Sequence, residues 1–275
     1  MMQYFETEKM TGNITRIADL TGVFSYLVTG KERAALIDTG TGFGDISDLV
    51  HELTDLPVIV ILTHGHCDHA GGAGPVPEVY LNEADWELVK ESAALEFRAG
   101  YVNSVTGGRY HVTGVDLVPD RAEGYLPLED GQTFDLGSLT LEAIRVKGHT
   151  PGMTCILIRE ERRIIFGDAC NTATFLWLPE SSGIDTYKEK LLRLKQREKE
   201  YDSVYLCHEI PEVGKQILDE VLLLCDEILA GTDDAAEFPL IPIPEVIAAR
   251  TLGKDGMPLA GGMGNIIYHK NRIRG

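Results

Sequence analysis

The sequence predicts an α/β protein in which two mixed β-sheets are sandwiched between helices as four layers, αββα. Two observations lead to this prediction. Short apolar runs of strand length alternate with segments of helical spacing, and the second half of the chain repeats the strand-then-helix order of the first. Because sheets and amphipathic helices must each bury an apolar face, this order favours sheets covered by helices.

The first half is predicted to begin with three strands, punctuated by the turns Thr21-Gly22 and Gly30-Lys31. A helix, a continuous apolar run typical of a strand buried on both faces, and a further helix should follow. In chain order, the expected strands and helices are Ile14–Ala18, Val23–Val28, Ala34–Ile37, the helix Ile46–Leu53, the buried strand Val58–Leu62 and the helix Glu83–Phe97.

The second half should contain strands at 139–146, 154–158 and 163–166, then a charged helix over 186–201. A short strand at 204–207, a helix over 211–230 and a last strand near 265–269 complete the prediction. The 275 residues are expected to form a single domain over 1–275, with a helical insertion near 83–125 and a C-terminal tail at 232–275.

Composition restricts the class of partner. The formal net charge of −18 argues against nucleic acid, because a phosphate backbone is normally met by Lys and Arg. The five cysteines form no C-x-x-C pair, the first twelve residues are charged, and no run approaches the roughly 18 apolar residues of a membrane helix. We therefore expect a cytoplasmic protein with reduced thiols that acts on a small molecule. The sequence does not indicate an oligomeric state.

The clearest chemical pattern is Thr63-His64-Gly65-His66-Cys67-Asp68-His69, directly after the buried strand. Alternate residues of an extended chain face the same way, so His64 and His66 should point together. The turn over Ala70-Gly71-Gly72 can aim Asp68 and His69 at a neighbouring point. One strand end could thus serve two metals about 3.5–4 Å apart. Imidazole with carboxylate suits zinc, although iron and manganese also accept these ligands.

This H-x-H-x-D-H pattern after a buried strand resembles the metallo-β-lactamase-fold superfamily. Four further segments resemble the other motifs of that family in their order along the chain. They are Leu36-Ile37-Asp38-Thr39-Gly40, Gly148-His149-Thr150-Pro151-Gly152, Phe166-Gly167-Asp168 and Leu206-Cys207-His208.

The resemblance implies two metal ions per chain and a role for each motif residue. The first metal would be bound by His64, His66 and His149, and the second by Asp68, His69 and His208. Asp168 would bridge both, and Asp68 is also expected to be catalytic. Asp38 would brace the ligand loop without binding metal, as the orientation of metal-bound imidazoles generally requires.

The expected reaction is hydrolysis, in which a metal-bound hydroxide attacks a small ester, thioester or lactone. True β-lactamases of this superfamily commonly have Cys or Ser at the bridging position, whereas Asp168 resembles the thioesterase, lactonase and phosphodiesterase branches. His66 disfavours the flavodiiron branch, which has Glu there. Two alternatives stay open, namely a mononuclear iron dioxygenase of the persulfide dioxygenase type and a phosphodiesterase of the same fold.

The remaining histidines and cysteines are expected to be structural. His51 should lie on a solvated helix face, whereas His111 and His269 could reach the pocket only if their loops fold over it. Cys67, Cys170 and Cys207 flank site residues, and we expect them to pack and not to bind metal. Part of the tail at 232–275 is proposed as a wall or lid of the pocket, with plain packing as the alternative.

Overall fold

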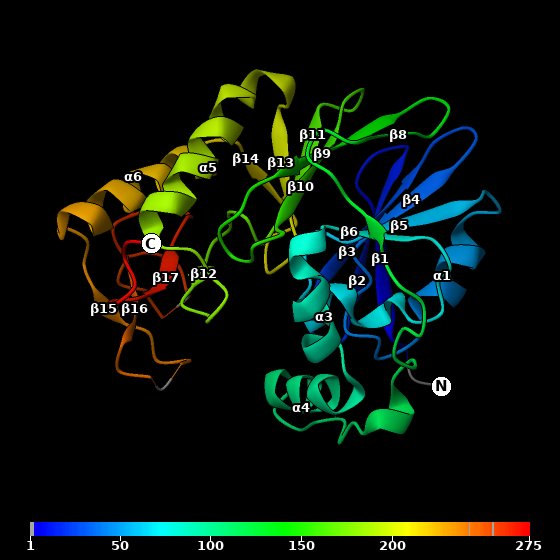
Figure 1. The fold of residues 1–275 in the computed structure, drawn as a ribbon, viewed down its shortest axis with the longest axis horizontal. Helices are drawn as coiled ribbons and strands as arrows, with labels where there is room; N and C mark the ends of the chain where they lie inside the picture. Colours follow the sequence, from blue (N-terminus) through cyan, green and yellow to red (C-terminus); the bar gives the residue numbers. More distant parts are fainter. Residues whose placement is uncertain (1–2, 242, 255) are drawn as a thin grey trace.

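The computed structural model describes residues 3–241, 243–254 and 256–275 and contains the two predicted mixed sheets, seen side by side in Figure 1. The first has seven strands in sequence order: β1 Phe5–Lys9, β2 Ile14–Asp19, β3 Phe24–Thr29, β4 Ala34–Ile37, β5 Val58–Ile61, β6 Val79–Leu81 and β7 Leu126–Pro127. The second has six, in spatial order: β14 Glu212–Gly214, β13 Ser203–Leu206, β11 Arg163–Gly167, β10 Thr154–Ile158, β9 Thr140–Arg145 and β8 Thr133–Asp135.

The helices lie outside the two sheets, as the four-layer prediction requires. Helices α5 and α6 pack against the second sheet, whereas α1 covers the first sheet on the opposite side of the molecule (Figure 1). The α-helices are α1 Ile46–Leu53, α2 Cys67–Ala70, α3 Trp86–Ser92, α4 Leu95–Val105, α5 Ile184–Gln196 and α6 Ile217–Ala230, and the 3-10 turns are η1 Gly71–Ala73, η2 Glu83–Asp85, η3 Gly114–Asp116 and η4 Glu198–Glu200.

The two central strands of the first sheet show why this layering forms. In β4, Ala35 and Ile37 enter the core between the sheets, while Leu36 packs on the helix side. In β5, Ile59 enters the core between the sheets, and Val60 packs on the helix side. Successive side chains of a strand point to opposite faces, so a continuous apolar run is needed where both faces are covered. The prediction of a doubly buried strand at 58–62 is confirmed.

Two predicted helices differ in the structure. The helix expected over 83–97 is broken, because Ala94 is extended and α4 begins at Leu95. The buried Arg98 side chain holds this break by donating from Nε to the carbonyl of Ala93 at 2.7 Å. The helix expected over 211–230 begins only at Ile217, because residues 212–214 instead form β14. There Val213 is buried and pairs with Val204 of β13, so sheet pairing prevails over helical spacing.

A third, four-stranded sheet was not predicted. Its order is β12 Thr174–Leu176, β17 Ile266–His269, β16 Val246–Ala248 and β15 Ala236–Glu237, so the tail pairs with a strand that follows the Asp168 loop. Phe238, Val246, Ala248 and Ile267 form its core. Within the described part of the chain, none of the helices combines the length and apolar character needed to cross a bilayer.

Candidate metal centre

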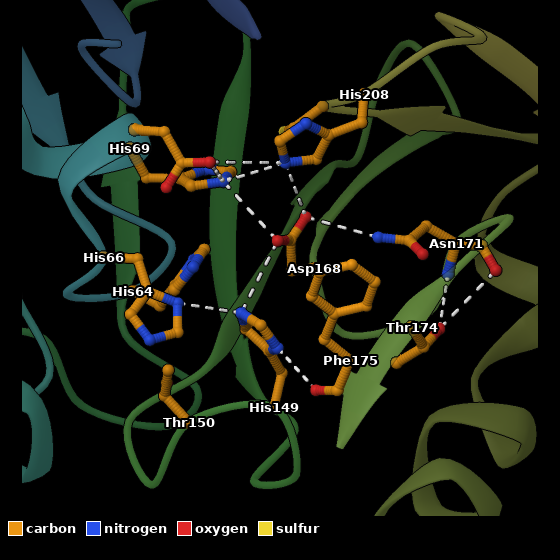
Figure 2. Close-up of polar contacts among 12 residues, drawn as sticks. His64, His66, His69, His149, Thr150, Asp168, Asn171, Thr174, Phe175 and His208 are labelled. Carbon is orange, nitrogen blue, oxygen red and sulfur yellow. Dashed lines mark hydrogen bonds and ion pairs between the residues drawn. The ribbon is translucent and has the colours of Figure 1, made fainter. Parts of the chain in front are cut away.

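The centre is built where strands of both sheets end. His64 and His66 follow β5, and His66 caps the short helix α2, which carries Asp68 and His69. His149 follows β9. Asp168 comes directly after β11, and His208 lies just beyond the end of β13. Because β11 and β13 are parallel, their carboxyl ends meet at one edge. His149, Asp168 and His208, from distant parts of the sequence, thus converge with the loop that carries His64, His66 and His69 (Figure 2).

The first group of candidate ligands contains His64, His66 and His149, whose donor atoms lie within 4.8 Å of one another. Nδ1 of His66 is 2.9 Å from Nε2 of His149. Two nitrogens bound to one tetrahedral zinc at 2.0–2.1 Å are about 3.3 Å apart. The observed separation is close to that value but is also a normal hydrogen-bond length, so the grouping of three histidines, and not this one distance, points to a shared ion.

The second group contains Asp68, His69 and His208, again within 4.8 Å. Nε2 of His69 lies 3.2 Å from Nε2 of His208, and Oδ2 of Asp68 lies 3.8 Å from that same His208 nitrogen. The three side chains come from α2 and from the loop after β13. They could hold a second ion beside the first group.

Asp168 lies between the two groups, as Figure 2 shows. Its Oδ1 is 3.2 Å from Nε2 of His208, and its Oδ2 is 3.5 Å from Nε2 of His149. The same Oδ2 is 3.6 Å from Nε2 of His69. The carboxylate therefore faces ligands of both groups, which is the geometry that a bridging carboxylate requires.

The outer nitrogens of His64, His66, His69 and His149 are already held, which leaves their inner nitrogens to face the centre. Nδ1 of His149 is 2.7 Å from the carbonyl oxygen of Phe175, and Nδ1 of His64 is 3.0 Å from Oγ1 of Thr63. Nε2 of His64 is buried and has no hydrogen-bond partner among the described residues. A buried polar atom without a partner is costly, and a metal ion would satisfy it. The donor set therefore fits zinc.

The charge states of His64, His149 and Asp168 agree with metal binding. Burial, with His66 nearby, lowers the pKa of His149 to about 4, and burial holds the pKa of His64 well below its usual value. Burial alone would raise the pKa of Asp168, but His208 and His69 outweigh it and keep that pKa well below its usual range. Neutral imidazoles and an ionised carboxylate are the forms that bind metal. Burial would lower the pKa of His69 and His208, but the Asp68 and Asp168 carboxylates outweigh it and raise both pKa values, so these two rings must lose a proton when a metal ion binds.

The sequence matches the model of a known protein family. Residues 18–208 match the family model described as the metallo-beta-lactamase superfamily, which is most of the chain and includes all the candidate ligands. The chain belongs to the metallo-beta-lactamase superfamily. Among solved structures, it is similar to a metallo-beta-lactamase from Pontibacter korlensis, with a TM-score of 0.62 and 20% identity over 81% of this chain and 99% of that one. This likeness confirms the predicted fold.

Curated relatives within the superfamily include enzymes. The chain is 25% identical to the probable polyketide biosynthesis zinc-dependent hydrolase BaeB of Bacillus velezensis, over 72% of this chain and 78% of that protein. It is 26% identical to the acyl-coenzyme A thioesterase MBLAC2 of Bos taurus, over 62% of this chain and 68% of that protein. The match to the lactamase-like protein ptaB of Pestalotiopsis fici covers only 46% of that longer relative. The prediction of a metal-dependent hydrolase agrees with these names.

Three polar residues of the site escaped the sequence analysis. Oδ2 of the buried Asp85 accepts bonds from the Gly65 amide at 3.0 Å and from the Thr150 hydroxyl at 2.7 Å, so it ties two histidine loops together. Oε1 of Glu180 is 2.7 Å from Nε2 of His66, and the Tyr101 hydroxyl donates to Oδ2 of Asp68 at 2.8 Å. Each lies outside the superfamily motifs, so only the folded chain brings it to the centre.

The cysteines near the centre are buried, and the expectation that they only pack stays a prediction, because Sγ of Cys207 lies within 4.8 Å of possible ligand atoms of Asp38 and His69. Cys67, Cys170 and Cys207 are buried and free. Burial raises the pKa of the Cys207 thiol to about 12, so it stays protonated and faces Asp38 at 3.8 Å. His51 is exposed on α1. His111 and His269 are absent from the described lining of the cavity over the centre, so neither reaches it.

That cavity has a volume of about 860 Å³ and lies over His66, Asp68, Asp168 and His208. Its walls come from α3 and α4 on one side and from residues 171–180 on the other. The proposed wall or lid from the tail is wrong for the described residues, because none of those in 232–275 lines the cavity. The tail instead supports the wall from behind, where Phe238 meets Phe175 edge to face at 6.0 Å between ring centroids.

Proposed function

We propose that the chain is a dinuclear metal-dependent hydrolase that cleaves small-molecule ester bonds, thioesters foremost. The observation that carries the proposal is the shared position of Asp168 between two complete groups of ligands. His64, His66 and His149 would hold one ion, Asp68, His69 and His208 the other, and Asp168 would bridge them. Zinc suits these ligands best, with iron or manganese as possible occupants.

Two bound divalent ions would supply a nucleophile from water near neutral pH and polarise the carbonyl of the substrate. The chain itself orients the ligands, because Thr63, Asp38 and the Phe175 carbonyl hold the outer nitrogens of three histidines. These contacts fix the tautomer and direction of each ring before any ligand binds.

Asp68 is the carboxylate that we propose as the catalytic proton acceptor. Its side chain lines the cavity, and its Oδ2 accepts a hydrogen bond from the Tyr101 hydroxyl. Burial raises its pKa, but His69 and His208 outweigh that effect, so the pKa is lowered and the side chain is ionised at neutral pH. An ionised carboxylate in the cavity lining can accept a proton as the substrate is attacked.

The thioester assignment draws on the relatives, two of which are named as a thioesterase and a zinc-dependent hydrolase. The complete second group, in which Nε2 of His208 lies 3.8 Å from Asp68 and 3.2 Å from Asp168, favours two ions over the single iron of a dioxygenase. A phosphodiesterase is disfavoured, because no Lys or Arg lies among the described residues that line the cavity.

The test is a hydrolysis panel on the zinc-loaded protein with phosphodiesters, lactones and uncharged thioesters. Oxygen consumption with a persulfide substrate is measured beside it on the iron-loaded protein. The proposal predicts turnover of thioesters that is abolished by a chelator and restored by zinc. Oxygen consumption with one iron per chain and no hydrolysis would refute it in favour of the dioxygenase.

A further inference from the structure

We infer that the cavity selects substrates with an apolar acyl group and an uncharged remainder, and that it rejects anionic carriers such as coenzyme A. This inference rests on the proposed hydrolysis of thioesters. It depends on two features of the cavity lining, its facing apolar walls and its charge.

Apolar side chains line both walls of the cavity. Leu88 of α3 and Phe97 and Val105 of α4 form one side. Phe97 and Val105 keep 55% and 49% of their surface exposed, although both are large apolar residues. Because they face the same cavity, their exposed surface is available to a bound ligand, and such contacts are typical of small-molecule sites.

The opposite wall is formed by Phe175, Trp177 and Leu178. The rings of Phe175 and Trp177 have centroids 6.3 Å apart. Arg272 of the tail fixes this segment, because its guanidinium donates to the carbonyls of Leu178 and Pro179 at 2.9 and 3.2 Å and also to that of Trp177. The wall is therefore formed before a ligand binds, which lowers the entropic cost of binding an acyl chain.

The charged residues of the lining are all acidic. They are the five carboxylates Asp68, Glu91, Asp168, Glu180 and Glu209. Two divalent ions would bring four positive charges, so the described lining would still not be net positive. Phosphate groups are normally bound by Arg, Lys or helix amides, and none of those cations lines this cavity in the described chain. The field of the molecule, with a net charge of −18, adds to the repulsion.

Two arginines in segments that adjoin the walls are already engaged. Arg272 is committed to the carbonyls behind the wall. Arg98 is fully buried and donates to the carbonyls of Gly71 and Val118 and to Asp120. Neither guanidinium is free to meet a carrier in the cavity.

The first experiment compares octanoyl-N-acetylcysteamine with octanoyl-coenzyme A on the zinc-loaded protein. We expect kcat/KM to be at least tenfold higher for the uncharged thioester, and the coenzyme A rate to rise with added salt as repulsion is screened. Equal or faster hydrolysis of the coenzyme A thioester would overturn the inference. If neither is hydrolysed, the proposed function fails, and calorimetric binding of the two compounds still decides the inference by which one binds more tightly.

Two variants localise the effect. Phe97→Ala should lower the ratio of octanoyl to acetyl thioester kcat/KM by about tenfold, because the exposed ring can no longer be covered by the acyl chain. Val115→Ala, which removes an equally apolar side chain that is 93% exposed and outside the lining, should leave the ratio unchanged. An unchanged ratio in Phe97→Ala with full metal content would remove the apolar wall from the argument.

The acidic lining has its own matched pair. Glu91→Lys places a cation in the lining and should raise kcat/KM for octanoyl-coenzyme A severalfold relative to the uncharged thioester. Glu87→Lys reverses a charge one turn earlier on α3, outside the lining, and serves as the control for the general change in net charge. Equal effects of the two reversals would show that the lining does not select against anions.

Discussion

Nδ1 of His69 lies 2.8 Å from Oδ2 of Asp38, and both side chains are fully buried. Asp38 also accepts the Thr63 amide at 2.7 Å and the Thr63 hydroxyl at 2.8 Å. Its backbone stands at φ +60°, in the left-handed region that costs most residues energy. A strained, buried carboxylate thus joins the end of β4 to the ligand loop and turns Nε2 of His69 toward Asp168.

Replacing Asp38 by Ala should lower activity about 10–100-fold while at least one metal ion stays bound, because the ring of His69 would lose its orientation. Asp38→Asn is the matched variant, since Asn also tolerates the left-handed backbone. It removes the negative charge without adding backbone strain. Elemental analysis and kcat measured together check the prediction. Loss of both ions from a folded protein would instead make Asp38 a direct ligand.

Removal of the proposed bridge should have a larger effect. Asp168→Ala is expected to abolish hydrolysis and to weaken the retention of at least one ion, because the carboxylate offsets the repulsion of two dications. Asn171→Ala offers a comparison that keeps the carboxylate itself, since Nδ2 of Asn171 donates to Oδ1 of Asp168 at 3.3 Å and its Oδ1 accepts the Ala173 amide at 2.8 Å. Turnover near the wild-type value with both ions bound in Asp168→Ala would show that the assigned role is wrong.

The Tyr101 hydroxyl is predicted to position Asp68. Tyr101→Phe removes one hydrogen bond to Oδ2 of Asp68 and keeps the ring in the cavity wall. We expect kcat to fall about 3–10-fold, as one such bond is worth about 1 kcal/mol, with KM and metal content little changed. A change in KM alone would assign Tyr101 to substrate binding.

Glu142 provides a test of fold stability away from the centre. Its carboxylate accepts bonds from Arg197 at 2.6 Å and from Arg159 at 2.8 Å. The bonds from Arg197, opposed by burial and assisted by Arg159, lower its pKa from the ordinary 4.5. The stabilisation is therefore present above about pH 4.5 and is lost as the pH falls through the lowered pKa of the folded state.

Glu142→Gln should reduce the free energy of unfolding by about 1–3 kcal/mol at pH 7, and the difference from wild type should shrink below about pH 4.5. Glu189→Gln, which affects an exposed pair with Arg193 on α5, should change stability little. Denaturant unfolding at several pH values measures both. A difference that stays constant down to pH 3 would contradict the electrostatic explanation.

Much of the fold could be predicted because the apolar runs match the burial pattern. Strands such as 34–37 and 154–158 coincide with β4 and β10, since both are buried along their whole length. The last strand expected near 265–269 coincides with β17, but its partner β12 is short and far away along the chain, so the third sheet itself could not be predicted. The break at Ala94 is held by a hydrogen bond from the buried Arg98, and no local sequence pattern indicates that this side chain is buried.

The candidate ligands came from motifs, whereas their supports did not. Glu180, Asp85 and Tyr101 reach the centre through tertiary contacts, and nothing in their neighbours distinguishes them from ordinary surface residues. Gly152 offers a partial signal, since a Cβ there would lie 2.7 Å from Cγ of Asp85. A glycine at that position allows the close approach of the buried carboxylate, but only the structure identifies its partner.

The most direct test is the metal content of the zinc-reconstituted protein after removal of loosely bound ions, measured for the wild type and for His208→Ala. We predict about two ions per chain for the wild type and about one for His208→Ala, whose first group of ligands stays complete. One ion or fewer in the wild type after reconstitution with excess zinc would contradict the dinuclear centre.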